Sequence, residues 1–198
     1  MIGAEIGSTE LKFIPGDIDS LELSEDVGTA GSMSLILQVL IPVVAISQKK
    51  LSLTIKGGTD VLWSPSIDYT QHVLKEAYSK MGIKFSIELI KRGYYPKGGG
   101  EIKLQVFPSK LKSISFSKRN SKNVELICTF SKIAIEIIER EIQKIKNKLT
   151  DEDYKVKVEI NNQEAIDSGA SLLVYSIDEN SIIGVDALFD KKTQSFDL

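Results

Sequence analysis

Residues 91–102 read Lys91-Arg92-Gly93-Tyr94-Tyr95-Pro96-Lys97-Gly98-Gly99-Gly100-Glu101-Ile102, with three consecutive glycines between two runs typical of β-strands. Glycine loses more backbone entropy on folding than any other residue, so a triplet indicates positive φ angles or a close backbone approach. Arg92 and Lys97 flank the glycines, and free N–H groups beside two cations could hold an anion such as phosphate. The alternative is a glycine-rich hairpin turn that joins the two strands.

Around this stretch the pattern predicts an α/β unit. Residues 31–46 are too densely apolar for a surface helix and predict a mostly buried one, capped by Ser32 and kinked or broken at Pro42. The other predicted elements are a strand at 51–55, a helix at 66–80, and strands at 84–91 and 101–107. The order helix, strand, helix, strand, strand favours a sheet covered on one face by two helices.

The polar segment from Pro108 to Asn123 predicts a boundary between one domain, residues 1–107, and a smaller α/β domain, residues 108–198. The elements predicted there are strands near 112–117, 123–130, 154–160, 171–177 and 181–188, and a helix at 132–149. The apolar side of that helix is predicted to comprise Ile135, Ile138, Ile142, Ile145 and Leu149. The order is compatible with a thioredoxin-like layout, but the single cysteine, Cys128, excludes a redox pair and reads as a buried strand thiol.

Composition restricts the classes of function. The chain has 198 residues, 42% hydrophobic and 26% charged, as in ordinary globular proteins. The formal net charge of -2 argues against a protein that coats nucleic acid through bulk charge, so any RNA contact must be local. No apolar run reaches the roughly 18 residues that span a bilayer, and no signal peptide is recognisable, so we expect a cytoplasmic protein without a membrane partner.

The glycine stretch resembles the signature of the RNA 3'-terminal phosphate cyclase family, which runs Arg or His, Gly, two residues, Pro, one residue and three glycines. Further blocks match in the same order: Gly3-Ala4-Glu5-Ile6-Gly7-Ser8, Gly28-Thr29-Ala30-Gly31-Ser32, Leu35-Ile36-Leu37-Gln38 and Gly57-Gly58-Thr59-Asp60, with Pro65 beyond. The resemblance is close from Met1 to Val106 and looser from Pro108 to Asp190, where the pattern suits the family's inserted domain. It implies the repeat unit of the cyclase fold followed by that domain.

The resemblance also implies a reaction. In the family, ATP adenylylates a histidine, AMP passes to an RNA 3'-phosphate, and the neighbouring 2'-hydroxyl closes a 2',3'-cyclic phosphate. A divalent metal, Mg or Mn, assists, and the RNA 3' end is the partner. The matching positions imply ATP-binding roles for Gln38 and Pro65. The residues with possible phosphate or RNA contacts are Arg92, Lys97, Gly98, Gly99 and Gly100.

Departures from the family pattern limit this interpretation. Family members are longer, and their histidine nucleophile lies in a C-terminal region that has no counterpart here. The only histidine, His72, reads as a helix-surface or boundary residue, and we assign it no catalytic role. We therefore expect this chain to be incomplete and inactive alone. The alternatives are a non-catalytic cyclase-like protein that binds RNA in ribosome biogenesis, and a stand-alone α/β binding module.

Three further features have competing interpretations. Asp60 and Asp68 could bind metal or, in our preferred interpretation, cap the following helix. Trp63 could stack on a base or simply pack. The 31–46 helix also carries apolar residues that cannot all face one sheet, namely Leu35, Leu37, Val39 and Ile41. We therefore expect an exposed apolar face and self-association.

Overall fold

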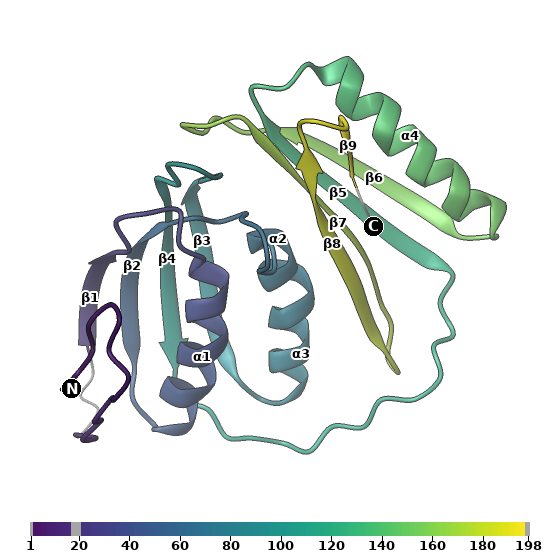
Figure 1. Ribbon diagram of the computed structural model, residues 1–198. Helices are drawn as coiled ribbons and strands as arrows, with labels where there is room; N and C mark the ends of the chain where they lie inside the picture. The colour runs from purple at the N-terminus through teal and green to yellow at the C-terminus, as the bar shows by residue number, and fades with distance from the viewer. Residues whose placement is uncertain (1, 17–20, 197–198) are drawn as a thin grey trace.

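The computed structural model describes residues 2–16 and 21–196, which form two β-sheets of mixed α/β architecture (Figure 1). We call the described residues up to 107 the core unit and residues 123–196 the second unit. The core sheet has the order β1-β2-β4-β3. Its strands are β1 (Leu21–Asp26), β2 (Leu51–Gly57), β3 (Lys84–Lys91) and β4 (Gly100–Phe107). β1 runs parallel to β2, and β4 is antiparallel to both β2 and β3.

Two helical segments cover one face of the core sheet, as predicted (Figure 1). They are α1 (Met33–Ile46) and the continuous run of α2 (Ile67–Tyr69), η1 (Thr70–Leu74) and α3 (Lys75–Lys80). Ser32 caps α1 by accepting a hydrogen bond from the N–H of Leu35 at 3.2 Å.

Pro42 does not break α1, which continues to Ile46, so the predicted break is wrong, whereas a kink there stays a prediction. A proline removes the N–H that would bond the carbonyl four residues earlier, here that of Gln38. The hydroxyl of Tyr78 donates to this carbonyl at 3.3 Å instead. The neighbouring helix thus satisfies the acceptor that the proline leaves free.

The core of this unit lies between α1 and the sheet. Met33, Leu37 and Ile41 of α1 are fully buried against strand residues such as Leu53 and Leu104. The prediction that Leu37 and Ile41 belong to an exposed face is therefore wrong, because their four-residue spacing from Met33 places all three on the stripe that faces the sheet. A second stripe of α1 is exposed, as predicted for two of its members; it comprises Leu35, Val39, Val43 and Ile46.

The second unit contains a five-stranded sheet of order β6-β5-β7-β8-β9. Its elements are β5 (Asn123–Ser131), α4 (Ile135–Asp151), β6 (Lys155–Asn162), β7 (Gly169–Ile177), β8 (Ile182–Asp190) and β9 (Ser195–Phe196). α4 connects the parallel strands β5 and β6 and covers one face of the sheet (Figure 1). Ile138 and Ile142, on the predicted apolar side, pack there on Cys128, whereas Ile135, in the first helical turn, is 39% exposed. The thioredoxin-like layout stays a prediction.

The other face of the second sheet contacts the helical run of the core unit. Val73 of η1 forms a small buried cluster with Ile127, Leu173 and Tyr175. A Cβ atom at Gly184 would lie 2.6 Å from a methyl group of Val73, so the glycine permits the close approach. The second sheet is thus enclosed between its own helix and a helix of the core unit.

Residues 108–122, between the two units, form no strand, so the strand predicted near 112–117 is wrong. The N–H groups of this segment bond to loops and helix ends instead of to a neighbouring strand. Ser109 donates to Ala45 at 3.0 Å, Lys112 to Met81 at 2.9 Å and Ser117 to Asn180 at 2.9 Å. Within the described part of the chain, no helix has the length and apolarity needed to cross a membrane.

Candidate functional site

Three glycine segments that are far apart in the sequence meet at one end of the core sheet. Gly58, after β2, donates to the carbonyl of Gly31 at 2.8 Å and accepts from the N–H of Met33 at 2.9 Å. Gly57 pairs with Gly100 across β2 and β4. The start of α1, the end of β2 and the glycine loop therefore form one backbone junction.

This junction has room only for glycine at several positions. A Cβ atom at Gly58 would lie 2.5 Å from the carbonyl oxygen of Ala30, and one at Gly93 would lie 2.3 Å from the nitrogen of Gly100. Gly98 has a φ of +70°, and a Cβ there would lie 2.8 Å from the Cα of Ala30. The glycine signature thus permits close backbone contact, and the hairpin alternative is confirmed because β3 and β4 pair on either side of the loop.

Arg92 directly follows β3, the first strand of this hairpin, and is a buried cation between two carboxylates. Its Nη1 lies 3.0 Å from Asp60 Oδ2, its Nη2 lies 2.5 Å from Asp68 Oδ1, and its side chain is 2% exposed. Asp60 follows β2, and Asp68 lies on α2. A buried guanidinium is tolerable only when its charge is compensated and its donors are bonded, and both conditions hold here.

The second unit supplies the remaining partners of Arg92. Nε donates to Gln163 Oε1 at 2.9 Å, Nη1 to Ser171 Oγ at 3.3 Å and Nη2 to Thr129 Oγ1 at 3.3 Å. Every nitrogen of the guanidinium is therefore engaged, and the contacts extend to both units. We call Arg92, Asp60, Asp68, Thr129 and Gln163 the Arg92 network.

The network shifts the pKa values of Arg92 and Asp68. Burial disfavours a charged guanidinium, but the carboxylates of Asp60 and Asp68 outweigh that effect and raise the pKa of Arg92. Burial raises the pKa of Asp68, and the nearby Asp60 adds to that, although Arg92 opposes both. Two carboxylates that share one cation leave an excess of negative charge in a region of low dielectric. The network is therefore costly to disturb.

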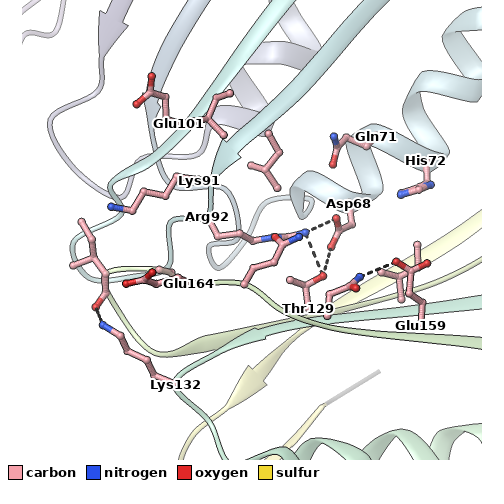
Figure 2. Close-up of a pocket in the computed structure, with 17 residues that line it drawn as sticks. Asp68, Gln71, His72, Lys91, Arg92, Glu101, Thr129, Lys132, Glu159 and Glu164 are labelled. Carbon is pink, nitrogen blue, oxygen red and sulfur yellow. Dashed lines mark hydrogen bonds and ion pairs between the residues drawn. The ribbon is translucent and has the colours of Figure 1, made fainter.

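A cleft of about 960 Å³ opens beside the network, between the end of β3 and the strands of the second unit (Figure 2). Its lining is polar and of mixed charge. The basic residues are Lys91, Arg92 and Lys132, and the acidic ones are Asp68, Glu101, Glu159 and Glu164. Lys132 donates to the carbonyl of Ile166 at 2.6 Å. Such a lining offers both donors and acceptors of hydrogen bonds. Because its charges are mixed, it provides no uniformly positive potential that would attract an anion.

The sequence model of the family described as RNA 3'-terminal phosphate cyclase matches residues 1–195. The chain belongs to this family. It is 38% identical over 195 residues to an RNA 3'-terminal phosphate cyclase of Sulfolobus acidocaldarius. This match covers 96% of this chain and 57% of the relative.

Other relatives of the cyclase family show the same pattern of coverage. The proteins of that name from Methanococcoides burtonii and Pyrococcus abyssi are 36% identical over 173 residues and 35% identical over 188 residues. These matches cover 87% and 94% of this chain, and 52% and 55% of the relatives. The chain thus spans about half the length of the curated relatives it matches.

The predicted site residues of this cyclase-family chain lie in different environments. Gln38 is half-buried on α1, and within the described residues its side chain has no hydrogen-bond partner. Pro65 is half-buried in the loop before α2. Neither lines the cleft beside the Arg92 network. Their roles toward ATP stay predictions.

The glycine loop is largely occupied by contacts within the protein. The N–H of Gly98 donates to the carbonyl of Tyr94 at 2.8 Å, and the N–H of Lys97 donates to Asp167 Oδ2 at 2.8 Å. Gly99 faces Ile166, and Gly100 pairs with Gly57. The Lys97 side chain is exposed, whereas Arg92 is buried among its partners. Phosphate or RNA contacts of these residues stay predictions.

The preferred interpretation of the two aspartates is wrong, because Ser66 caps α2 through a hydrogen bond from Tyr69 N–H at 3.2 Å. Asp60 and Asp68 instead compensate the charge of Arg92. His72 is half-buried on η1 as a boundary residue, with its ring 5.3 Å from that of Tyr175.

Sequence reasoning did not find the partners in the second unit. Thr129 lies within an apolar strand and Gln163 follows β6, and neither belongs to a recognisable motif. The available signal was a polar residue at a position where the strand pattern predicts burial.

Proposed function

We propose that this chain forms the nucleotide-positioning part of an RNA 3'-terminal phosphate cyclase. The observation that supports this most is the convergence of three signature glycine segments at the start of α1, the helix that carries Gln38. The proposed substrates are ATP and an RNA 3'-phosphate, and the proposed product is a 2',3'-cyclic phosphodiester formed through enzyme–AMP and RNA-adenylate intermediates. The names of the relatives favour this over a non-catalytic role in ribosome biogenesis. A cytoplasmic location is part of the same proposal.

The chemistry of α1 fits a nucleotide. A carboxamide can donate to phosphate or accept from a base, and that of Gln38 is half-buried without a partner in the described part of the chain. One turn earlier, the buried Ser34 Oγ also has no hydrogen-bond partner among the described residues. ATP, when bound, supplies the adenylyl group that activates the RNA phosphate. Gln38 would hold and orient it.

A divalent metal has no such fit among the residues that the structure describes. Among residues 2–16 and 21–196, no three His, Cys, Asp or Glu side chains gather where they could hold an ion. The candidate carboxylates Asp60 and Asp68 are committed to Arg92. We therefore assign no step to a metal held by the described residues.

Grafting tests the proposed function. Residues 1–195 replace the matching part of the Sulfolobus acidocaldarius relative, and the chimera receives ATP and an RNA with a labelled 3'-phosphate. We expect the label to become resistant to phosphatase, as in a cyclic phosphate. A folded chimera that leaves the label phosphatase-sensitive, while the unaltered relative protects it, would reject the function.

Gln38→Ala in this chimera should weaken ATP use by about 1–3 kcal/mol, the scale for losing a hydrogen bond to a charged group. The matched control is Gln143→Ala, which removes an exposed carboxamide on α4. Steady-state kinetics with ATP varied give the comparison, and equal effects of the two substitutions would remove Gln38 from the nucleotide site.

A further inference from the structure

Two loops of the core unit present a cluster of exposed apolar and aromatic side chains. Trp63 is 94% exposed, Tyr95 is 71% exposed and Leu62 is 63% exposed. Trp63 also has a φ of +60°, a conformation that bulky side chains rarely adopt. The strained backbone and the exposure of a large aromatic ring to solvent each lower the stability of the fold. Their combination indicates a role in binding.

The framework beneath this cluster is fixed. The N–H groups of Thr59 and Asp60 both donate to the carbonyl of Gly93, at 2.9 and 3.3 Å, so the two loops lie side by side. Tyr94, between Gly93 and Tyr95, is buried and donates to the carbonyl of Thr129 at 3.2 Å. The exposed rings therefore stand on a support that both units hold in place.

A second cleft, of about 760 Å³, lies under these rings, and we call it the Trp63 cleft. It is lined by Leu62, Trp63 and Tyr95 on one side and by residues of β8 and the turn after it on the other, including Lys191 and Lys192. Three carboxylates also line it: Asp60 is paired with Arg92, and Asp186 and Asp190 accept backbone hydrogen bonds from Ser66 and Lys192. Both lysines are exposed and form no ion pair among the described residues.

The combination of exposed rings and two exposed lysines suits an unpaired nucleobase and its phosphate. Aromatic rings stack on any base, and cations beside them contact the backbone of the strand. We propose that the Trp63 cleft binds single-stranded RNA by stacking a base on Trp63 and Tyr95. The choice of RNA rests on the proposed function, whereas the stacking geometry does not.

Because Trp63 is the only tryptophan, its intrinsic fluorescence reports on this cleft alone. The 198-residue chain is titrated with a short oligouridylate at low ionic strength, and anisotropy of a labelled copy measures total binding. A strand of the same length without bases, and ATP alone, serve as ligand controls. We expect the oligouridylate to quench Trp63, and neither control to match it.

Tyr95→Ala and Trp63→Ala should each weaken binding about ten-fold by anisotropy, the effect of losing one stacked base. Phe116→Ala, which removes an exposed ring from the segment between the units, should leave binding unchanged. Circular dichroism establishes that the variants are folded.

Three outcomes would overturn the proposal: RNA binding without quenching, no RNA binding, or equal quenching by ATP alone. Quenching by RNA in a protein whose chimera forms no cyclic phosphate would keep the RNA site and reject the cyclase function.

Discussion

At the scale of single residues, Arg92 shows that a residue of the glycine signature can serve to hold the fold together. Its position beside three glycines predicts contact with phosphate, yet its guanidinium is buried between Asp60 and Asp68 and bonded to the second unit. Removing one member of a buried ion pair leaves an uncompensated charge, which costs more than the pair itself contributes. The conformation of the hairpin therefore depends on Arg92.

Arg92→Met should lower the free energy of unfolding by about 3–5 kcal/mol, because it leaves two buried carboxylates without their cation. Lys97→Met removes the exposed cation of the same motif. The free energy of unfolding of this variant should stay within about 0.5 kcal/mol of that of the wild type. Urea unfolding of the two variants measures the difference. Similar unfolding midpoints would show that the buried network contributes little to stability.

At the scale of elements, the periodic parts of the chain were predictable and the parts held by tertiary contacts were not. The helix at 31–46 and the strands 84–91 and 101–107 follow from local pattern, and each is present. The carbonyl that Pro42 leaves free in α1 accepts a hydrogen bond from Tyr78, a residue of another helix, which no local pattern reveals.

The same distinction applies to the candidate site. The glycine blocks could be recognised from their spacing, but the partners of Arg92 could not, because Thr129 and Gln163 approach it only through the packing of the second unit. β1 was not predicted, although apolar and polar residues alternate from Leu21 to Glu25.

Gly98→Ala should lower the free energy of unfolding by about 2 kcal/mol or more, because alanine disfavours a φ of +70° and its methyl group meets the backbone of Ala30. Gly16→Ala is the matched control, since its Cβ meets nothing within 4 Å and its φ needs no glycine. Thermal denaturation of both variants measures the effect. A Gly98→Ala protein as stable as Gly16→Ala would contradict the close contact between the loop and α1.

At the scale of the whole molecule, two apolar clusters support the proposal that residues 1–107 and 108–198 are two domains. One lies between α1 and the core sheet, and the other between α4 and the second sheet. The Arg92 network and the contacts of Val73 join the two units.

The exposed stripe of α1 should cause self-association at high micromolar concentration. Val39 is 70% exposed and Val43 is 50% exposed, and burying such side chains between molecules is favourable. Val39→Glu combined with Val43→Glu should shift the chain toward monomer, whereas Leu111→Glu, at an exposed site outside the helix, should not. Analytical ultracentrifugation decides this, and a wild-type monomer at those concentrations would disprove the interface.

The most direct test of the proposed division of roles uses ATP labelled on the α-phosphate. We propose that this chain positions the nucleotide while a histidine of the family's C-terminal region, which the chimera contains, takes up AMP. We expect no covalent label on the isolated 198-residue chain in a denaturing gel, and a labelled band for the chimera. Label on the isolated chain that disappears in His72→Ala would contradict it.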